Sequence, residues 1–102
     1  MSRLQHLYIS RPGDKDRIRE NYASLMDISD EQLVENYNRQ ARLGIVGVHA
    51  QVLFLLAMNV QFMFRFGTSP LTIKDQVIIR FSGLIELQGD GFSYTELFEY
   101  GD

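Results

Sequence analysis

Residues 45–66 read IVGVHAQVLFLLAMNVQFMFRF, and they form the most apolar stretch of the chain. A helix of this length is about long enough to cross a bilayer. Polar side chains interrupt the run, however, and polar groups are costly in hydrocarbon. We therefore predict a buried central helix of a soluble domain and no membrane association. The interrupting residues are His49, Gln51, Asn59, Gln61 and Arg65.

One side of this central helix mixes polar and apolar residues at helical spacing. We call this set the mixed stripe, and its members are Gly47, Gln51, Phe54, Met58, Gln61 and Arg65. Two outcomes are open. Either the N-terminal helix or the C-terminal strands cover the stripe, or Phe54 and Met58 form an exposed patch edged by polar groups. In the second case we expect a twofold homodimer whose interface contains Gln51, Phe54, Met58, Gln61 and Arg65.

The apolar side of the helix lies opposite the mixed stripe and is expected to face the core. It consists of Ile45, Val48, Val52, Leu55, Leu56, Val60 and Met63, with His49 and Asn59 among them.

A second helix is predicted from Asp30 to about Leu43. Ser29 and Gln32 have the spacing of a capping box, and Ile28 and Leu33 have the spacing of a hydrophobic staple. Gly44 is expected to end the helix. The short connection 44–47 should place this helix against the central one as an αα-hairpin. The expected buried positions are Leu33, Val34, Tyr37 and Ala41.

An N-terminal helix is predicted after the turn at residues 11–14, with Asp14 as its cap. Its apolar positions are Ile18, Tyr22, Leu25 and Met26. Before the turn, residues 4–9 are expected to form an edge strand or an extended arm.

The segment after Gly67 and Pro70, which end the central helix, has two interpretations. In the favoured one, residues 77–81 form a strand, and residues 84–88 and 92–95 form a hairpin around Gly89-Asp90-Gly91. Its register places Ile85 and Leu87 opposite Phe92 and Tyr94. In the alternative, Thr72 and Asp75 start a helix that runs to Gly89 and gives an all-α bundle, and Ser93 with Glu96 start a final helical turn. Val-Ile-Ile and Gly83 weaken a helix, so we predict a single α+β domain over residues 1–102, with a small antiparallel sheet packed on the helices.

The charge of the chain is unevenly distributed. The formal net charge is -3, and residues 67–102 hold two basic and six acidic residues. This composition speaks against nucleic-acid binding, which needs a basic surface, and favours a basic protein partner. The chain has no cysteine, so disulfides and thiolate metal sites are excluded and a cytoplasmic location is expected.

Few residues in the sequence suggest catalysis or ligand binding. His49 has the residue type for acid–base work, but a core histidine bonded to a polar neighbour is the ordinary outcome. If it reached Tyr37, Arg39 and Arg42 across the helical hairpin, these four residues would form a small polar pocket for an anionic ligand. No nucleophile, phosphate-loop or metal-binding motif is present, and no cofactor is implied. The sequence therefore favours a small acidic, non-catalytic interaction protein, such as an inhibitor or antidote of a protein partner, that self-associates. A small enzyme or ligand-binding domain is the alternative.

Overall fold

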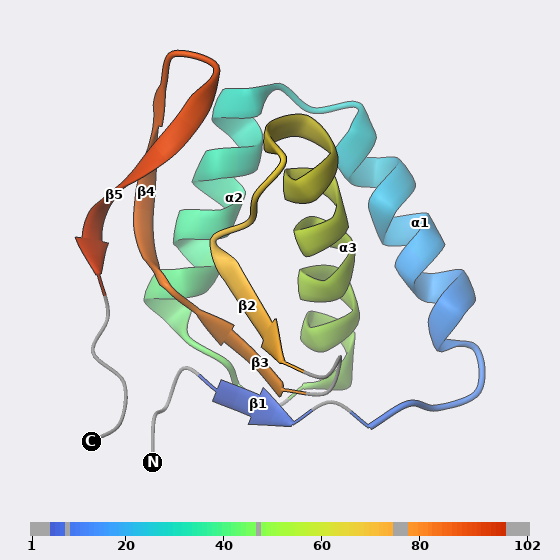
Figure 1. Ribbon diagram of the computed structural model, residues 1–102. Helices are drawn as coiled ribbons and strands as arrows, with labels where there is room; N and C mark the ends of the chain where they lie inside the picture. Colours follow the sequence, from blue (N-terminus) through green and yellow to red (C-terminus); the bar gives the residue numbers. More distant parts are fainter. Residues whose placement is uncertain (1–4, 8, 47, 75–77, 98–102) are drawn as a thin grey trace.

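The computed structural model describes residues 5–7, 9–46, 48–74 and 78–97 of the 102-residue chain. These residues form an α+β fold, as predicted. The helices are α1 (Asp14–Met26), α2 (Asp30–Leu43) and α3 (His49–Phe66). The strands are β1 (Gln5–Leu7), β2 (Leu71–Lys74), β3 (Ile78–Phe81), β4 (Gly83–Gln88) and β5 (Gly91–Leu97), and Figure 1 shows their arrangement. Among the described helices, none combines the length and the apolar character needed to cross a membrane.

The ends of α2 and α3 follow local chemistry. The capping box is confirmed, because the Gln32 backbone N–H donates to Ser29 Oγ at 3.1 Å and the Ser29 backbone N–H donates to Gln32 Oε1 at 2.9 Å. Gly67 ends α3 in the left-handed conformation, with φ at 74°, where a residue without Cβ is favoured.

The prediction that Asp14 caps α1 is wrong. Gly13 occupies the cap position with φ at 86°, and Asp14 is the first helical residue. The Pro12-Gly13 turn moves the helix start by one position, and the Arg11 backbone N–H donates to Asp14 Oδ2 at 2.7 Å. The buried Asp14 side chain is thereby turned toward the interior. Of the four apolar positions named for this helix, Met26 is exposed at the end of α1.

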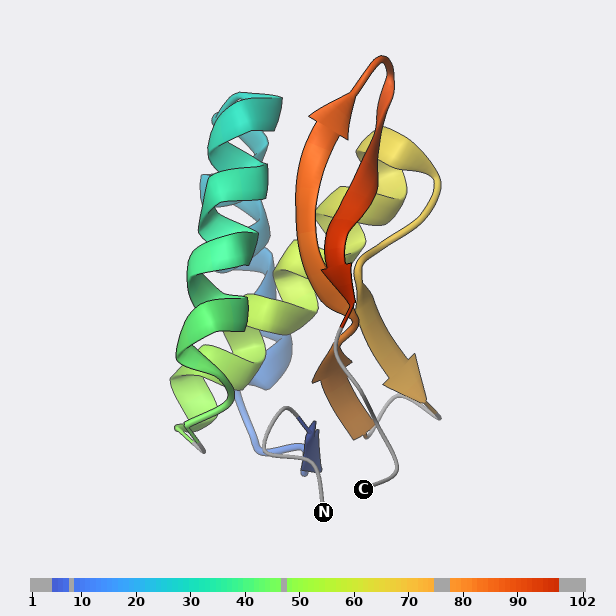
Figure 2. The same ribbon diagram turned by 90° about the vertical axis from the view of Figure 1, so that its left-hand side faces the viewer.

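The helices α1 and α3 run side by side in the same direction (Figure 1). His49 at the start of α3 contacts Asp14 at the start of α1, and Arg65 near the end of α3 contacts the end of α1. The antiparallel order of α2 and α3 agrees with the predicted hairpin, but α3 is inclined to α2 (Figure 2). The helix α2 packs more closely against β4 than against α3. The inclination of α3 makes room for the strands, so the closest helix pair is α1 with α3 rather than α2 with α3.

The C-terminal third is built from strands, and the helical alternative is wrong where the structure describes it. A three-stranded antiparallel sheet has the order β1-β3-β2, and β4 and β5 form a separate hairpin. The predicted register is confirmed by the pairs Ile85–Tyr94 and Leu87–Phe92. Thr72, considered as a helix cap, lies in β2, a strand that the sequence analysis did not predict. Ser93 and Glu96 lie in β5 rather than in a helical turn. Asp75 and Val77 fall outside the described residues.

The core is centred on Tyr37, whose ring meets Phe62 and Phe81 edge-on at centroid distances of 5.7 and 5.8 Å. Phe62 in turn contacts Phe92 of β5. All four predicted inward positions of α2 are buried. The aromatic rings therefore join α2, α3 and both strand groups, and edge-to-face pairs of this kind add to the free energy gained by apolar burial.

Candidate binding groove between α2 and β4

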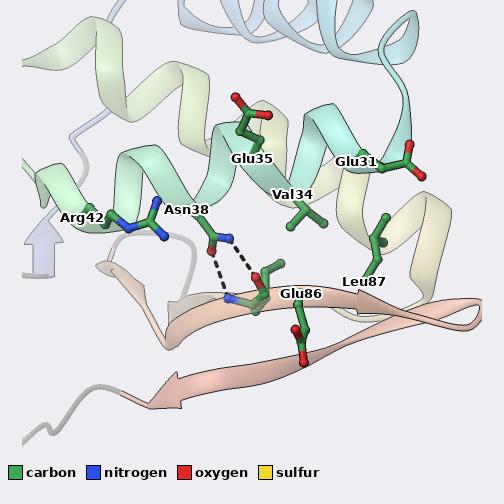
Figure 3. A pocket seen from close by; sticks show the side chains of 8 residues that line it. Glu31, Val34, Glu35, Asn38, Arg42, Glu86 and Leu87 are labelled. Atoms are coloured by element: carbon green, nitrogen blue, oxygen red, sulfur yellow. Dashed lines mark hydrogen bonds between the residues drawn. The ribbon is translucent and has the colours of Figure 1, made fainter.

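Two side chains of α2, Tyr37 and Asn38, form hydrogen bonds with the backbone at the outer edge of β4. Asn38 Nδ2 donates to the Ile85 carbonyl at 2.7 Å, and the Ile85 backbone N–H donates to Asn38 Oδ1 at 2.9 Å (Figure 3). One helical step away, the Tyr37 hydroxyl donates to the Gly83 carbonyl at 2.6 Å. Asn38 thus takes the place that a neighbouring strand would fill, because it satisfies both backbone groups of Ile85.

The same edge continues to Leu87. In an antiparallel hairpin, residues two apart direct their backbone N–H and C=O to the same side. The backbone groups of Ile85 point toward α2, so those of Leu87 do as well. Within the described residues, no side chain bonds to this pair, which leaves a short edge to which an extended segment can be added.

A groove of about 380 Å³ follows this edge. Its apolar floor comes from Val34, Ile85 and Leu87. Its polar lining consists of Glu31, Glu35, Asn38, Arg42 and Glu86, and Figure 3 shows how these side chains are distributed along α2 and β4. Apolar surface with a charged margin is typical of sites that recognise another chain.

The charge at the groove is predominantly negative. The Glu35 carboxylate is 3.2 Å from Arg39 Nη2 in an exposed ion pair, whereas Glu31 and Glu86 form no ion pair with any residue that the structure describes. Residues 83–97 contain three acidic residues and no lysine or arginine. Arg42 also lines the groove, and the Glu86 carboxylate points from β4 to the side away from α2 (Figure 3). The carboxylates of Glu31 and Glu86 would therefore attract a basic segment from two sides of β4 rather than from two facing walls.

The predicted pocket around His49 is not assembled. His49 Nε2 bonds to Asp14 Oδ1 at 2.9 Å, and this carboxylate side chain is only 6% exposed. Tyr37 reaches the strand backbone, Arg39 pairs with Glu35, and Arg42 lies at the groove. The four side chains therefore point to different contacts, and His49 has the ordinary bonded role that the sequence favoured. The described residues contain no group of three or more potential metal ligands.

The mixed stripe is covered within the chain, so the expectation of an exposed patch there is corrected. Met58 is 0% and Gln61 2% exposed, and Phe54 packs against the core. Gln51 bonds to Gln40 Oε1 and to the Gly44 carbonyl. Gly47 falls outside the described residues.

Arg65 also belongs to the interior of this chain. Its Nη2 donates to the carbonyls of Leu25 and Ile28, each at 2.8 Å, and its Nη1 donates to Asp30 Oδ1 at 3.0 Å. The mixed stripe faces inward at this point, where Arg65 donates to backbone carbonyls at the end of α1 and in the following loop. Carbonyls at a helix end have no partner within the helix.

The sequence analysis did not identify the groove, although both of its walls were predicted. The register of the hairpin placed Leu87 opposite Phe92, and Asn38 lies within the polar segment 36–42. What was missing was that α2 packs on β4. Comparisons with protein-family models, with curated proteins and with solved structures found no match to this chain.

Proposed function

We propose that this chain is a non-catalytic interaction protein whose groove between α2 and β4 binds a basic, extended segment of another protein. The observation that carries the proposal is the backbone edge at Leu87, which lies in a groove with an apolar floor and with Glu31 and Glu86 among its lining residues. Main-chain bonds to a strand edge provide affinity, and pockets beside the edge select side chains.

The expected segment has a simple pattern. Its backbone pairs with Leu87, one apolar side chain lies on Val34 and Leu87, and lysine or arginine residues flank it and reach the carboxylates. The apolar contact provides free energy, whereas the charges mainly accelerate encounter and set the register. Binding should therefore weaken as the salt concentration rises. An acidic protein of this kind would act as an inhibitor or antidote by occupying a basic site of its partner.

The cellular location is part of the proposal. A chain without cysteine fits a reducing compartment, so we propose that it acts in the cytoplasm. The separate contacts of Tyr37, Arg39, Arg42 and His49 do not support the alternative of a ligand-binding or enzymatic function based on these four residues.

Selection from a random peptide library tests the proposal. The bait is the wild-type protein, compared with the double variant Glu31→Lys/Glu86→Lys. The matched control is Glu20→Lys, which reverses an exposed charge on α1. We expect wild type and control to enrich the same peptides with lysine or arginine around an apolar residue, and the double variant to lose them. Each interface charge of this kind typically changes the binding free energy by about 1 kcal/mol or more. The affinity of the double variant for the selected peptides should therefore be at least about tenfold lower. Enrichment of acidic peptides, or an unchanged selection with the double variant, would contradict the proposal.

A further inference from the structure

The groove between α2 and β4 has two ends of opposite charge. Glu31 lies in the first turn of α2 and Arg42 in its last turn, and both side chains line the groove. Along the helix axis they are about 16 Å apart, which is about twice the screening length at physiological salt. Glu35, the acidic lining residue between them, pairs with Arg39. A negative group of a partner can therefore be attracted to Arg42 with little repulsion from the Glu31 end.

Arg42 is the cation of this groove. Its side chain is exposed, and within the part of the chain that the structure describes it forms no ion pair. Figure 3 shows its guanidinium directed along α2 toward Asn38, which precedes it by one helical turn. A guanidinium presents several N–H donors in a planar fork that matches a carboxylate. Arg42 therefore suits a carboxylate at this end of the groove.

Asn38 determines where an added strand has to stop. Its side chain bonds to both backbone groups of Ile85. A segment that pairs with Leu87 consequently cannot pair with Ile85, the next position on the same edge. The segment has to end or leave the edge within about two residues of Leu87. Arg42 lies just beyond Asn38, at the place where such a segment would end.

We infer that the groove recognises the free C-terminus of its partner, with the terminal carboxylate bound to Arg42. The inference rests on the proposed function and adds the direction and the end of the bound segment. An antiparallel segment runs opposite to β4, so its C-terminal side points from Leu87 toward Asn38 and Arg42. A parallel segment would bring its N-terminal side there, and the guanidinium would repel a terminal amine. In the antiparallel direction, the basic residues before the apolar one lie at the Glu31 end.

The net charge of the protein alone gives the opposite expectation. The chain has a formal net charge of -3. A peptide that ends in a carboxamide is more positive by one unit than the same peptide with a carboxylate, so general attraction favours the amide. A preference for the carboxylate would instead report a cation placed at the end of the segment.

Titration with two synthetic peptides tests the inference. Both have the sequence that the wild-type chain enriches in the library selection, cut one residue after its apolar position, and they differ only in ending with a carboxylate or a carboxamide. Fluorescence anisotropy measures the dissociation constants. We expect the wild-type chain to bind the carboxylate form about tenfold more tightly, as a charge-assisted hydrogen bond provides. The variant Arg42→Gln should bind both forms with the affinity that the wild-type chain has for the amide.

The matched control is Arg39→Gln, which removes an exposed cation about one turn earlier on α2 and should retain the preference for the carboxylate. The dipole of α2 also favours a cation at Arg42, so circular dichroism checks that Arg42→Gln is folded. The ratio of the two affinities does not change with a partial loss of folded protein, because both peptides need the same folded chain.

Three results would overturn the inference and leave the proposed groove in place. These are equal binding of both forms by the wild-type chain, a preference that Arg42→Gln retains, and an amidated peptide ending in glutamate that binds as tightly as the carboxylate form. Failure of the wild-type chain to bind either form would contradict the proposed function, and this inference with it.

Discussion

Arg65 shows how much a single side chain depends on its surroundings. Its sequence neighbours suggest a polar edge of a surface patch, yet its side chain is only 13% exposed. The guanidinium donates to Gln61, to Asp30 and to carbonyls at the end of α1. No local pattern in the sequence shows that these carbonyls lie within reach, because they come from the end of α1 and the following loop, 37 to 40 residues earlier. The residue type was informative, but its partners were not predictable.

The substitution Arg65→Ala is therefore expected to destabilise the fold. It removes the donor to the Leu25 and Ile28 carbonyls, whose hydrogen bonds are part-buried, and a loss of charge-assisted hydrogen bonds of this kind costs about 3 kcal/mol. The matched control is Arg39→Ala, which removes an exposed ion pair with Glu35 and should cost less than about 0.5 kcal/mol. Urea unfolding followed by circular dichroism measures both. Equal losses of unfolding free energy would show that Arg65 does not hold the α1–α2 connection in place.

At the scale of elements, the sequence predicted most where the signal was local. The capping box located α2, and the Gly-Asp-Gly turn with alternating apolar residues located the β4–β5 hairpin and its register. The strand β2 was missed because four residues carry too little pattern. Val60 and Met63 were wrongly assigned to the core side of α3 because they are as apolar as core residues, and only the position of α1 shows that they are left uncovered.

The hairpin also contains a position at which only glycine fits. A Cβ on Gly83 would collide with the backbone carbonyl of Glu96 on β5, and backbone cannot yield as a side chain tip can. Gly83→Ala should therefore cost more than about 2 kcal/mol of unfolding free energy. Gly91→Ala in the same hairpin is the control, since nothing lies within 4 Å of a Cβ there. A thermal melt with similar midpoints for the two variants would argue against this close approach of β4 and β5.

At the scale of the whole molecule, the candidate site exists only because distant segments meet. Glu31 and Asn38 of α2 face Ile85 and Leu87 of β4 across the groove. The uneven charge along the chain indicated a basic partner, but not where it would bind. The polar residues near His49 looked more like a site in the sequence, and the fold separates them. The candidate site consists of a backbone edge, an apolar floor and several carboxylates, and such a combination has no sequence motif. The sequence alone therefore could not have predicted it.

The most direct measurement of the central proposal is an NMR titration of the isotope-labelled chain with a basic peptide obtained from the library selection. The largest shifts should fall on the Leu87 backbone amide and the Asn38 side-chain amide, and the Leu87 amide should become protected from hydrogen exchange as it pairs with the peptide backbone. The affinity should fall as salt is added. Shifts centred on the α1–α3 face, or an unprotected Leu87 amide at saturation, would contradict binding in the groove between α2 and β4.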